Sequence, residues 1–193
     1  MVATAIELAK IDVTLRGLPP GILMCGKGKM EHDANGTGKK GVQLTPEKEA
    51  DLHANWMKNG KSRVLCIPWV NVYKCLCEAA GRFKEGKRAM TQLVAATISC
   101  EQDRISLGTD RYEVYREWCR IPPKTGAMVQ VARPRLTEWE ASFTMVVDPE
   151  FYKNVGILEE VLKTAGKMVG LGPWRPALKG PYGRFVVANF EIR

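Results

Sequence analysis

The chain has 193 residues, 45% hydrophobic and 26% charged, which is typical of a globular protein that buries a core. No apolar run approaches the ~20 residues that a membrane-spanning helix needs, and the first residues show no signal-like pattern. Lysine and arginine number 29 against 21 acidic residues, a formal net charge of +8. We therefore expect a cytoplasmic protein without a membrane partner, whose charge favours a polyanion such as nucleic acid.

Cysteine usage gives little support for a metal site. None of the six cysteines forms a Cys-x-x-Cys pair, and His32 and His53 are the only histidines. We expect no metal and no cofactor, and we expect reduced cysteines that are mostly buried. The glycines of residues 36–41 also lack the spacing of a phosphate-binding P-loop, which argues against an ATPase.

The first half of the chain contains segments with the alternation of a strand and segments typical of a helix. Ile11, Val13 and Leu15 alternate with polar residues, which predicts a strand that ends before Gly17. A flexible insertion rich in glycine and lysine is expected at about 21–45. Thr45 followed by Pro46 is typical of a helix start. The predicted elements are strand 4–16, helix 46–58, strand 64–67, helix 69–83 and helix 89–96.

Strands dominate the second half. Segments 97–107 and 112–121 flank Gly108-Thr109-Asp110, which predicts a hairpin. Segments 128–134 and 138–147 are expected to form a second pair. A helix over 151–168 has its apolar residues at helical spacing, and a last strand follows at 184–192. Trp56, Trp69, Trp118 and Trp139 are expected in the core, and Trp174 on an exposed loop.

The order of elements predicts an α+β fold. Without the insertion it is strand, helix, strand, strand, helix, strand, the split βαβ arrangement of the ferredoxin-like fold. We expect one domain over 1–193, with an antiparallel sheet, two helices on one face and the inserted basic loop. The free face of such a sheet commonly binds single-stranded nucleic acid, although a fold alone does not define a function.

The segment 170–187 is the most informative motif. Its glycines Gly170, Gly172, Gly180 and Gly183 allow backbone to approach another backbone or a phosphate closely. Arg175, Lys179 and Arg184 supply cations without a nearby acid, and Trp174 and Tyr182 offer stacking faces. A rigid turn with buried aromatic rings explains the same residues, so both interpretations stay open.

This part of the chain contains, in order, a helix, Gly-x-Gly, a spacer, Gly-x-x-Gly and an apolar strand. This pattern resembles the glycine-rich loop of the RAMP superfamily of CRISPR proteins. The second glycine pair is one residue longer than the usual form. The pattern is most similar to that of backbone subunits, which polymerise along guide RNA, and a phage or plasmid relative fits equally well. The resemblance implies single-stranded RNA as partner, self-assembly side by side, other subunits of a ribonucleoprotein, and a loop at 26–40 that contacts nucleic acid or a neighbour.

Basic residues in four regions are the expected contacts with nucleic acid. Arg133-Pro134-Arg135 joins two predicted strands, so both guanidiniums could lie along one sheet edge, unless Glu138 and Glu140 pair with them. The residues that we expect to bind are Lys27, Lys29, Lys39, Lys40, Arg82, Lys84, Lys87, Arg88, Arg133, Arg135, Arg175, Lys179 and Arg184.

Two other functions remain open. One is a metal-independent endoribonuclease: related processing nucleases often use a histidine, for which His32 is the candidate, and some backbone subunits use an aspartate on the loop, as Asp33 could. The other is a protein–protein module, such as a phage structural or anti-defence factor. We expect binding without catalysis, and RNA is favoured over DNA.

Overall fold

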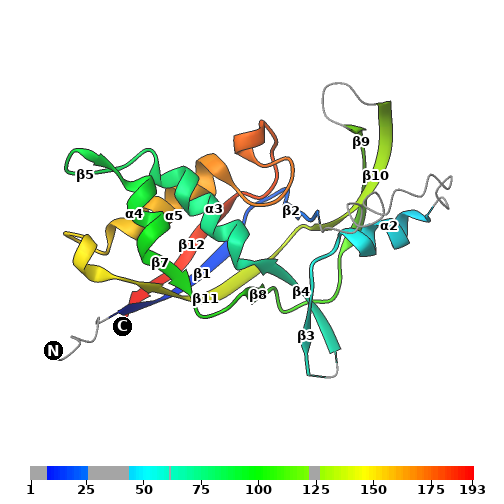
Figure 1. Ribbon diagram of the computed structural model, residues 1–193. Helices are drawn as coiled ribbons and strands as arrows, with labels where there is room; N and C mark the ends of the chain where they lie inside the picture. The colour runs from blue at the N-terminus through cyan, green and yellow to red at the C-terminus, as the bar shows by residue number, and fades with distance from the viewer. Residues whose placement is uncertain (1–7, 26–43, 61, 122–126) are drawn as a thin grey trace, which may run out of the picture.

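A four-stranded antiparallel sheet forms one layer of the computed structural model, which describes residues 8–25, 44–60, 62–121 and 127–193 (Figure 1). Its order is β12-β1-β11-β7. On the central strand, Val13 pairs with Phe143 on one side and with Phe190 on the other. The strands are β1 (Ala9–Gly17), β7 (Ile98–Cys100), β11 (Glu140–Val147) and β12 (Phe185–Ile192).

Helices cover one face of this sheet (Figure 1). They are α3 (Trp69–Ala80), α4 (Met90–Thr97) and α5 (Ile157–Thr164), which continues into a π-helical turn, η2 (Ala165–Val169). The alternating residues Ile11, Val13 and Leu15 are buried in the same core as the helices. The buried positions of α3 lie at helical spacing, from Val72 to Ala80. No helix in the described part of the chain is long and apolar enough to cross a membrane.

A second group of strands extends from one end of this body (Figure 1). β9 (Glu113–Ile121) and β10 (Ala127–Leu136) form a long antiparallel ribbon, and the short β2 (Ile22–Leu23) pairs with β10. Helix α2 (Pro46–His53) packs against β10. A small sheet joins β3 (Trp56–Asn59), β4 (Ser62–Pro68) and β8 (Arg104–Ser106), and β5 (Lys84–Glu85) pairs with β6 (Arg88–Ala89).

The α+β class with antiparallel sheets is confirmed, and so are the helix after Pro68 and the last strand. The predicted helix 46–58 is too long. It ends at His53, and Trp56–Asn59 forms a strand that pairs with β4. Asn59-Gly60 closes this hairpin with Gly60 at φ 61°, a backbone conformation that glycine adopts without strain.

The predicted strand pairs are wrong. Segments 112–121, 128–134 and 138–147 do form strands, whereas 97–107 divides into two short strands, β7 and β8, that belong to different sheets. β9 pairs with β10, β7 with β11, β8 with β4, and β11 also with β1. The predicted helix 151–168 also begins differently, because a 3-10 turn, η1 (Pro149–Phe151), comes before α5. Local turn residues favour neighbours in sequence, whereas burial of one face of each strand determines the pairing. Residues 4–7 of the predicted first strand lie outside the described residues.

Candidate nucleic-acid interface

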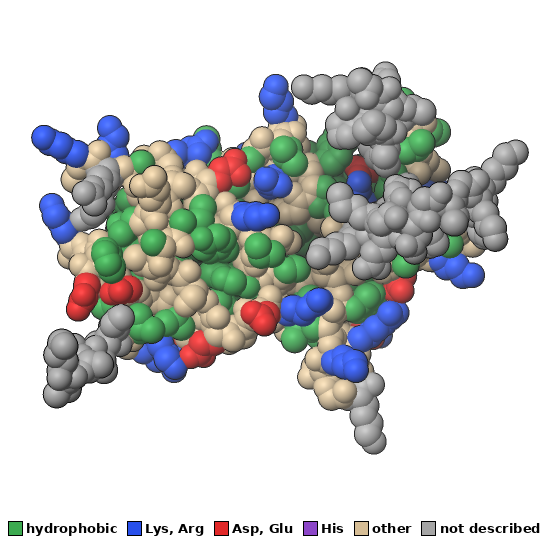
Figure 2. All heavy atoms as spheres, viewed as in Figure 1, with side chains coloured by type: hydrophobic (Ala, Val, Ile, Leu, Met, Phe, Trp, Pro, Cys, Tyr) green, Lys and Arg blue, Asp and Glu red, His purple; other side chains and the backbone are tan. Residues whose placement is uncertain are grey.

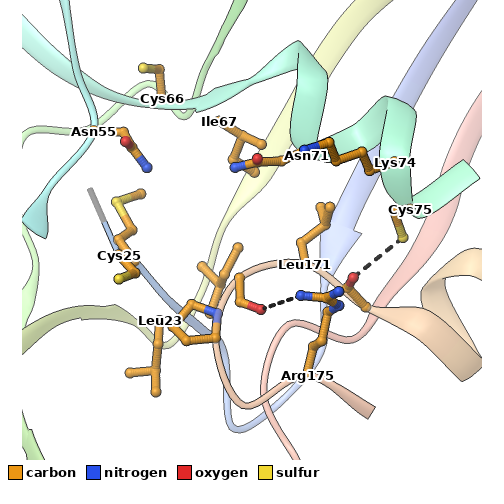
Figure 3. A pocket seen from close by; sticks show the side chains of 15 residues that line it. Leu23, Cys25, Asn55, Cys66, Ile67, Asn71, Lys74, Cys75, Leu171 and Arg175 are labelled. Carbon is orange, nitrogen blue, oxygen red and sulfur yellow. Dashed lines mark hydrogen bonds between the residues drawn. The ribbon is translucent and has the colours of Figure 1, made fainter. Parts of the chain in front are cut away.

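A pocket of about 290 Å³ lies where β2, β4, α3 and the glycine-rich segment meet (Figure 3). Asn71 and Lys74 on α3 line one side, and Arg175 of the glycine-rich segment lines the other. Asn55 adds a further amide. Two cationic side chains and two side-chain amides therefore border one cavity. Amides both donate and accept hydrogen bonds, and the combination of cations with amide donors suits an anionic ligand.

The glycines build the wall of this pocket from backbone. A Cβ atom on Gly172 would collide with the Leu23 carbonyl of β2, and one on Gly183 would collide with the backbone of Leu171. The Leu171 amide donates to the Gly183 carbonyl at 2.9 Å. Gly172 and Gly183 have φ values of 79° and 73°. These glycines thus serve close backbone–backbone packing, one of the two uses that the motif predicts.

Arg175 is held at the pocket wall by two contacts. Its Nη1 donates to the Gly172 carbonyl at 3.4 Å (Figure 3). Its Nη2 lies 3.8 Å from a carboxylate oxygen of Glu78 on α3. The side chain is partly buried, so these contacts restrict its position. A guanidinium has five N–H donors, which leaves donors for a phosphate oxygen in the pocket.

The pocket residues Asn55, Asn71 and Lys74 were not predicted. Asn71, Lys74 and Glu78 follow one another at helical spacing beside the buried stripe of α3. That spacing is the only signal in the sequence, and it is common on solvated helix faces. The glycine-rich segment gives these residues a role, because it packs next to α3 and brings Arg175 opposite Lys74.

The aromatic residues of the glycine-rich segment divide between the two interpretations. Tyr182 is buried, with its ring centroid 5.6 Å from that of Tyr115 on β9. Trp174 is 47% exposed and has φ 53°, and Lys179, which ends the short turn η3 (Pro176–Leu178), has φ 62°. Left-handed backbone costs a non-glycine residue roughly 1–2 kcal/mol, so the fold holds Trp174 in a strained, exposed position.

The predicted basic residues do not form one surface. Arg82, Lys84 and Lys87 are exposed around the β5–β6 turn, at the other end of the helical layer from β10, and Arg88 lies in β6 (Figure 1). Figure 2 shows Lys and Arg side chains spread over this face of the molecule, with acidic side chains between them. Lys179 and Arg184 are exposed on the glycine-rich segment near Arg175 in sequence.

Arg133 and Arg135 lie within β10 and do not join two strands. Arg133 forms an ion pair with Glu117 of β9, both largely buried, and Arg135 pairs with Glu113 at 2.5 Å. Their partners lie on β9 and are not Glu138 or Glu140: Glu113 is directly opposite Arg135, and Glu117 is a diagonal neighbour of Arg133. Their expected alignment along a sheet edge is therefore wrong, and both guanidiniums are already engaged.

Several predicted positions fall elsewhere. Lys27, Lys29, Lys39, Lys40, His32 and Asp33 lie outside the described residues, so their roles stay predictions.

The open face of the four-stranded sheet carries polar cross-strand contacts, such as Arg16 with Glu140 at 3.2 Å and Thr14 with Ser142 at 2.9 Å. Trp118, expected in the core, is 60% exposed on β9, because its side of the ribbon faces away from α2 and the buried Glu117.

No family model and no curated protein match this chain. Among solved structures, a chain in the cryo-EM structure of the Type III-B Cmr-beta bound to cognate target RNA is similar, with a TM-score of 0.50 and 12% sequence identity. The match covers 97% of this chain and 61% of that chain, so this protein spans less than two thirds of its length. The likeness shows a shared fold.

Proposed function

We propose that this protein is a RAMP-like subunit that binds single-stranded nucleic acid, RNA in preference to DNA, without reading its sequence. The sheet order supports the split βαβ interpretation: β1 and β11, its first and third strands, lie in the centre, with β12 and β7 outside them. The likeness to a chain of the RNA-bound Cmr-beta structure supports the same class.

The pocket between α3 and the glycine-rich segment carries the proposal. Lys74 and Arg175 would bind phosphate oxygens of one nucleotide unit, which fixes the strand without contact to a base edge. Asn55 and Asn71 offer both donor and acceptor groups, which suits a ribose 2′-hydroxyl and favours RNA. The exposed Trp174 would stack on an adjacent base.

The open sheet face suits this function less well. Its central residues are engaged with one another, as Asp12 is with Thr144 at 2.8 Å and with Arg193 at 2.7 Å. We therefore propose that the strand lies along the pocket and not over the sheet. The protein would assemble side by side with further copies or other subunits, in the cytoplasm, and would bind RNA without cleaving it.

Anisotropy of a labelled 30-mer tests this proposal, with single-stranded RNA, single-stranded DNA and duplex titrated at two salt concentrations. We expect the tightest binding to single-stranded RNA and weaker binding at the higher salt, because phosphate contacts release counterions. Absence of binding at low salt would overturn the proposal and favour the protein–protein module.

The variants Lys74→Ala and Arg175→Ala locate the interface. Each should weaken RNA binding about tenfold, since a hydrogen bond to a charged group contributes roughly 1.5–3 kcal/mol. Lys153→Ala is the matched control, because Lys153 is exposed, lies outside the pocket and carries the same charge. Equal losses in all three variants would show that only net charge matters and would remove the pocket from the proposal.

A further inference from the structure

The register in which β2 pairs with β10 places Cys25 beside a buried arginine. β2 and β10 pair Ile22 with Leu136 and Leu23 with Arg135, and the Met24 amide continues the ladder to the Pro134 carbonyl at 3.0 Å. One residue further along each segment, two residues beyond the end of β2, Cys25 comes opposite Arg133. Arg133 is largely buried, forms its ion pair with Glu117, and has a buried Nη1 without a hydrogen-bond partner among the described residues.

His53 approaches the same thiol from helix α2. Glu49, one turn earlier on that helix, accepts a hydrogen bond from the Ala132 amide of β10 at 3.1 Å, which fixes this face of α2 against β10. His53 lies on the same face of α2 and so faces β10, next to Cys25, with which it interacts. It is only 4% exposed, and its Nδ1 has no hydrogen-bond partner among the described residues.

The surroundings of Cys25 differ from those of the other described cysteines. Contact with His53, followed by the charge of Arg133, outweighs burial and lowers the pKa of the Cys25 thiol. Burial raises the pKa of Cys66, Cys77 and Cys100, and it raises that of Cys75 to about 12. Cys25 is also the exposed one of these five, so a reagent can reach it.

We propose that Cys25, His53 and Arg133 form a reactive thiolate site that reduces small hydroperoxides. The Cys25 thiolate attacks the terminal oxygen of the peroxide, a sulfur–oxygen bond forms and the oxygen–oxygen bond breaks. The sulfur is oxidised by two electrons to a sulfenic acid. The leaving alkoxide or hydroxide takes up the proton that the Cys25 thiol released, which His53 passes on, and departs as alcohol or water.

Arg133 has a distinct part in this chemistry. Its guanidinium opposes the thiolate and stabilises the negative charge on the sulfur, while Glu117 holds the guanidinium in place. The charged groups that face the site are thus Arg133 and Glu117 from the ribbon, and His53 and Glu49 from α2. Cys25 also lines the pocket proposed for RNA, but the peroxide reaction needs no nucleic acid, so its tests are independent of the proposed function.

The first experiment compares the folded full-length chain with the same chain unfolded in guanidinium chloride. Cys25 is alkylated with iodoacetamide between pH 5.5 and 9.5, and its rate is followed by peptide mass spectrometry. We expect the rate in the folded chain to reach half its maximum at lower pH than in the unfolded chain, because the thiolate is the reacting species. A half-maximal pH equal to or above that of the unfolded chain would overturn the proposal, whatever the exposure of Cys25.

The second experiment uses hydrogen peroxide and a dimedone trap for sulfenic acid. The adduct should form on Cys25 at least about tenfold faster than on Cys100, and Cys25→Ser should abolish it. His53→Gln should slow the reaction at Cys25 and raise its half-maximal pH. Equal trapping at both cysteines would contradict the proposal, and the wild-type comparison stands even where His53→Gln does not fold.

Discussion

The Gly183 amide donates a hydrogen bond of 2.7 Å to the carbonyl of Gly21, so the glycine-rich segment is tied to the turn that follows β1. The Leu171 amide in turn donates a hydrogen bond to the Gly183 carbonyl, which connects the same residue to the loop that follows η2. The pocket wall is therefore built on backbone contacts between three parts of the chain that lie far apart in sequence.

Gly183→Ala should destabilise the fold by about 3 kcal/mol, because a left-handed backbone and a steric collision with Leu171 act together. Urea unfolding measures the change. Gly86→Ala is the control: Gly86 has a similar φ of 62° and open space around its Cβ position, so it should cost only about 1 kcal/mol. Equal costs would show that the close approach at Gly183 contributes nothing.

The Arg133–Glu117 ion pair is expected to contribute to the stability of the fold because it is buried. Glu117→Ala leaves a buried guanidinium without its partner and should lower the free energy of unfolding by about 3–5 kcal/mol. The exposed cross-strand pair Arg16–Glu140 is its counterpart on the open sheet face, and Glu140→Ala should cost less than about 1 kcal/mol. Similar losses in thermal or urea unfolding would contradict this difference.

Stability at high pH should depend on Cys75. Burial raises the pKa of its thiol from 9.0 to about 12, so the unfolded chain loses this proton before the folded chain does. The contribution of Cys75 to stability is therefore complete below pH 9 and falls as the pH rises towards 12, by up to roughly 1.4 kcal/mol per pH unit.

Urea unfolding at pH 8 and at pH 10.5 checks this sign. Because lysines and tyrosines also titrate in that range, the informative quantity is the difference between the wild type and Cys75→Ala. The wild type should lose more stability than the variant on going to the higher pH. A variant that loses as much would refute the assignment.

Trp174→Gly should move stability and binding in opposite directions. Glycine relieves the left-handed strain at this exposed position, so unfolding should require up to about 1 kcal/mol more free energy. The same change removes the stacking face and should weaken single-stranded RNA binding about tenfold, as expected for one stacked base. Leu178→Ala is the control, since Leu178 is exposed nearby and offers no ring; it should leave RNA affinity unchanged.

Local periodicity was sufficient for the helices and strands whose buried face repeats regularly. Val72, Leu76 and Ala80 mark α3, and Val13 and Leu15 mark β1, because each pattern follows from a single element facing the core. Strand pairing could not be predicted in the same way. Ile98 lies opposite Val147, 49 residues along the chain, and nothing local distinguishes that partner from a nearer one.

The candidate site shows the same limit. Arg175 was expected from the glycine-rich segment, but Lys74 became a candidate only once α3 was placed against that segment. Arg133 was expected at a surface because the residues around it form a short Arg-Pro-Arg motif. The structure buries it against Glu117, which lies two residues along β9 from Tyr115, the residue directly opposite Arg133 in the β9–β10 register.

The two-residue strand β2 has a mechanical consequence. It hydrogen-bonds to β10 of the long ribbon, its Leu23 carbonyl lies against Gly172, and a short turn joins it to β1. A lateral load on the ribbon, as a bound neighbour would apply, would reach the rim of the pocket through this short strand and through the contact of Tyr115 with Tyr182. A change in the tilt of the ribbon is therefore expected to change the width of the pocket, because both contacts connect the ribbon to the pocket rim.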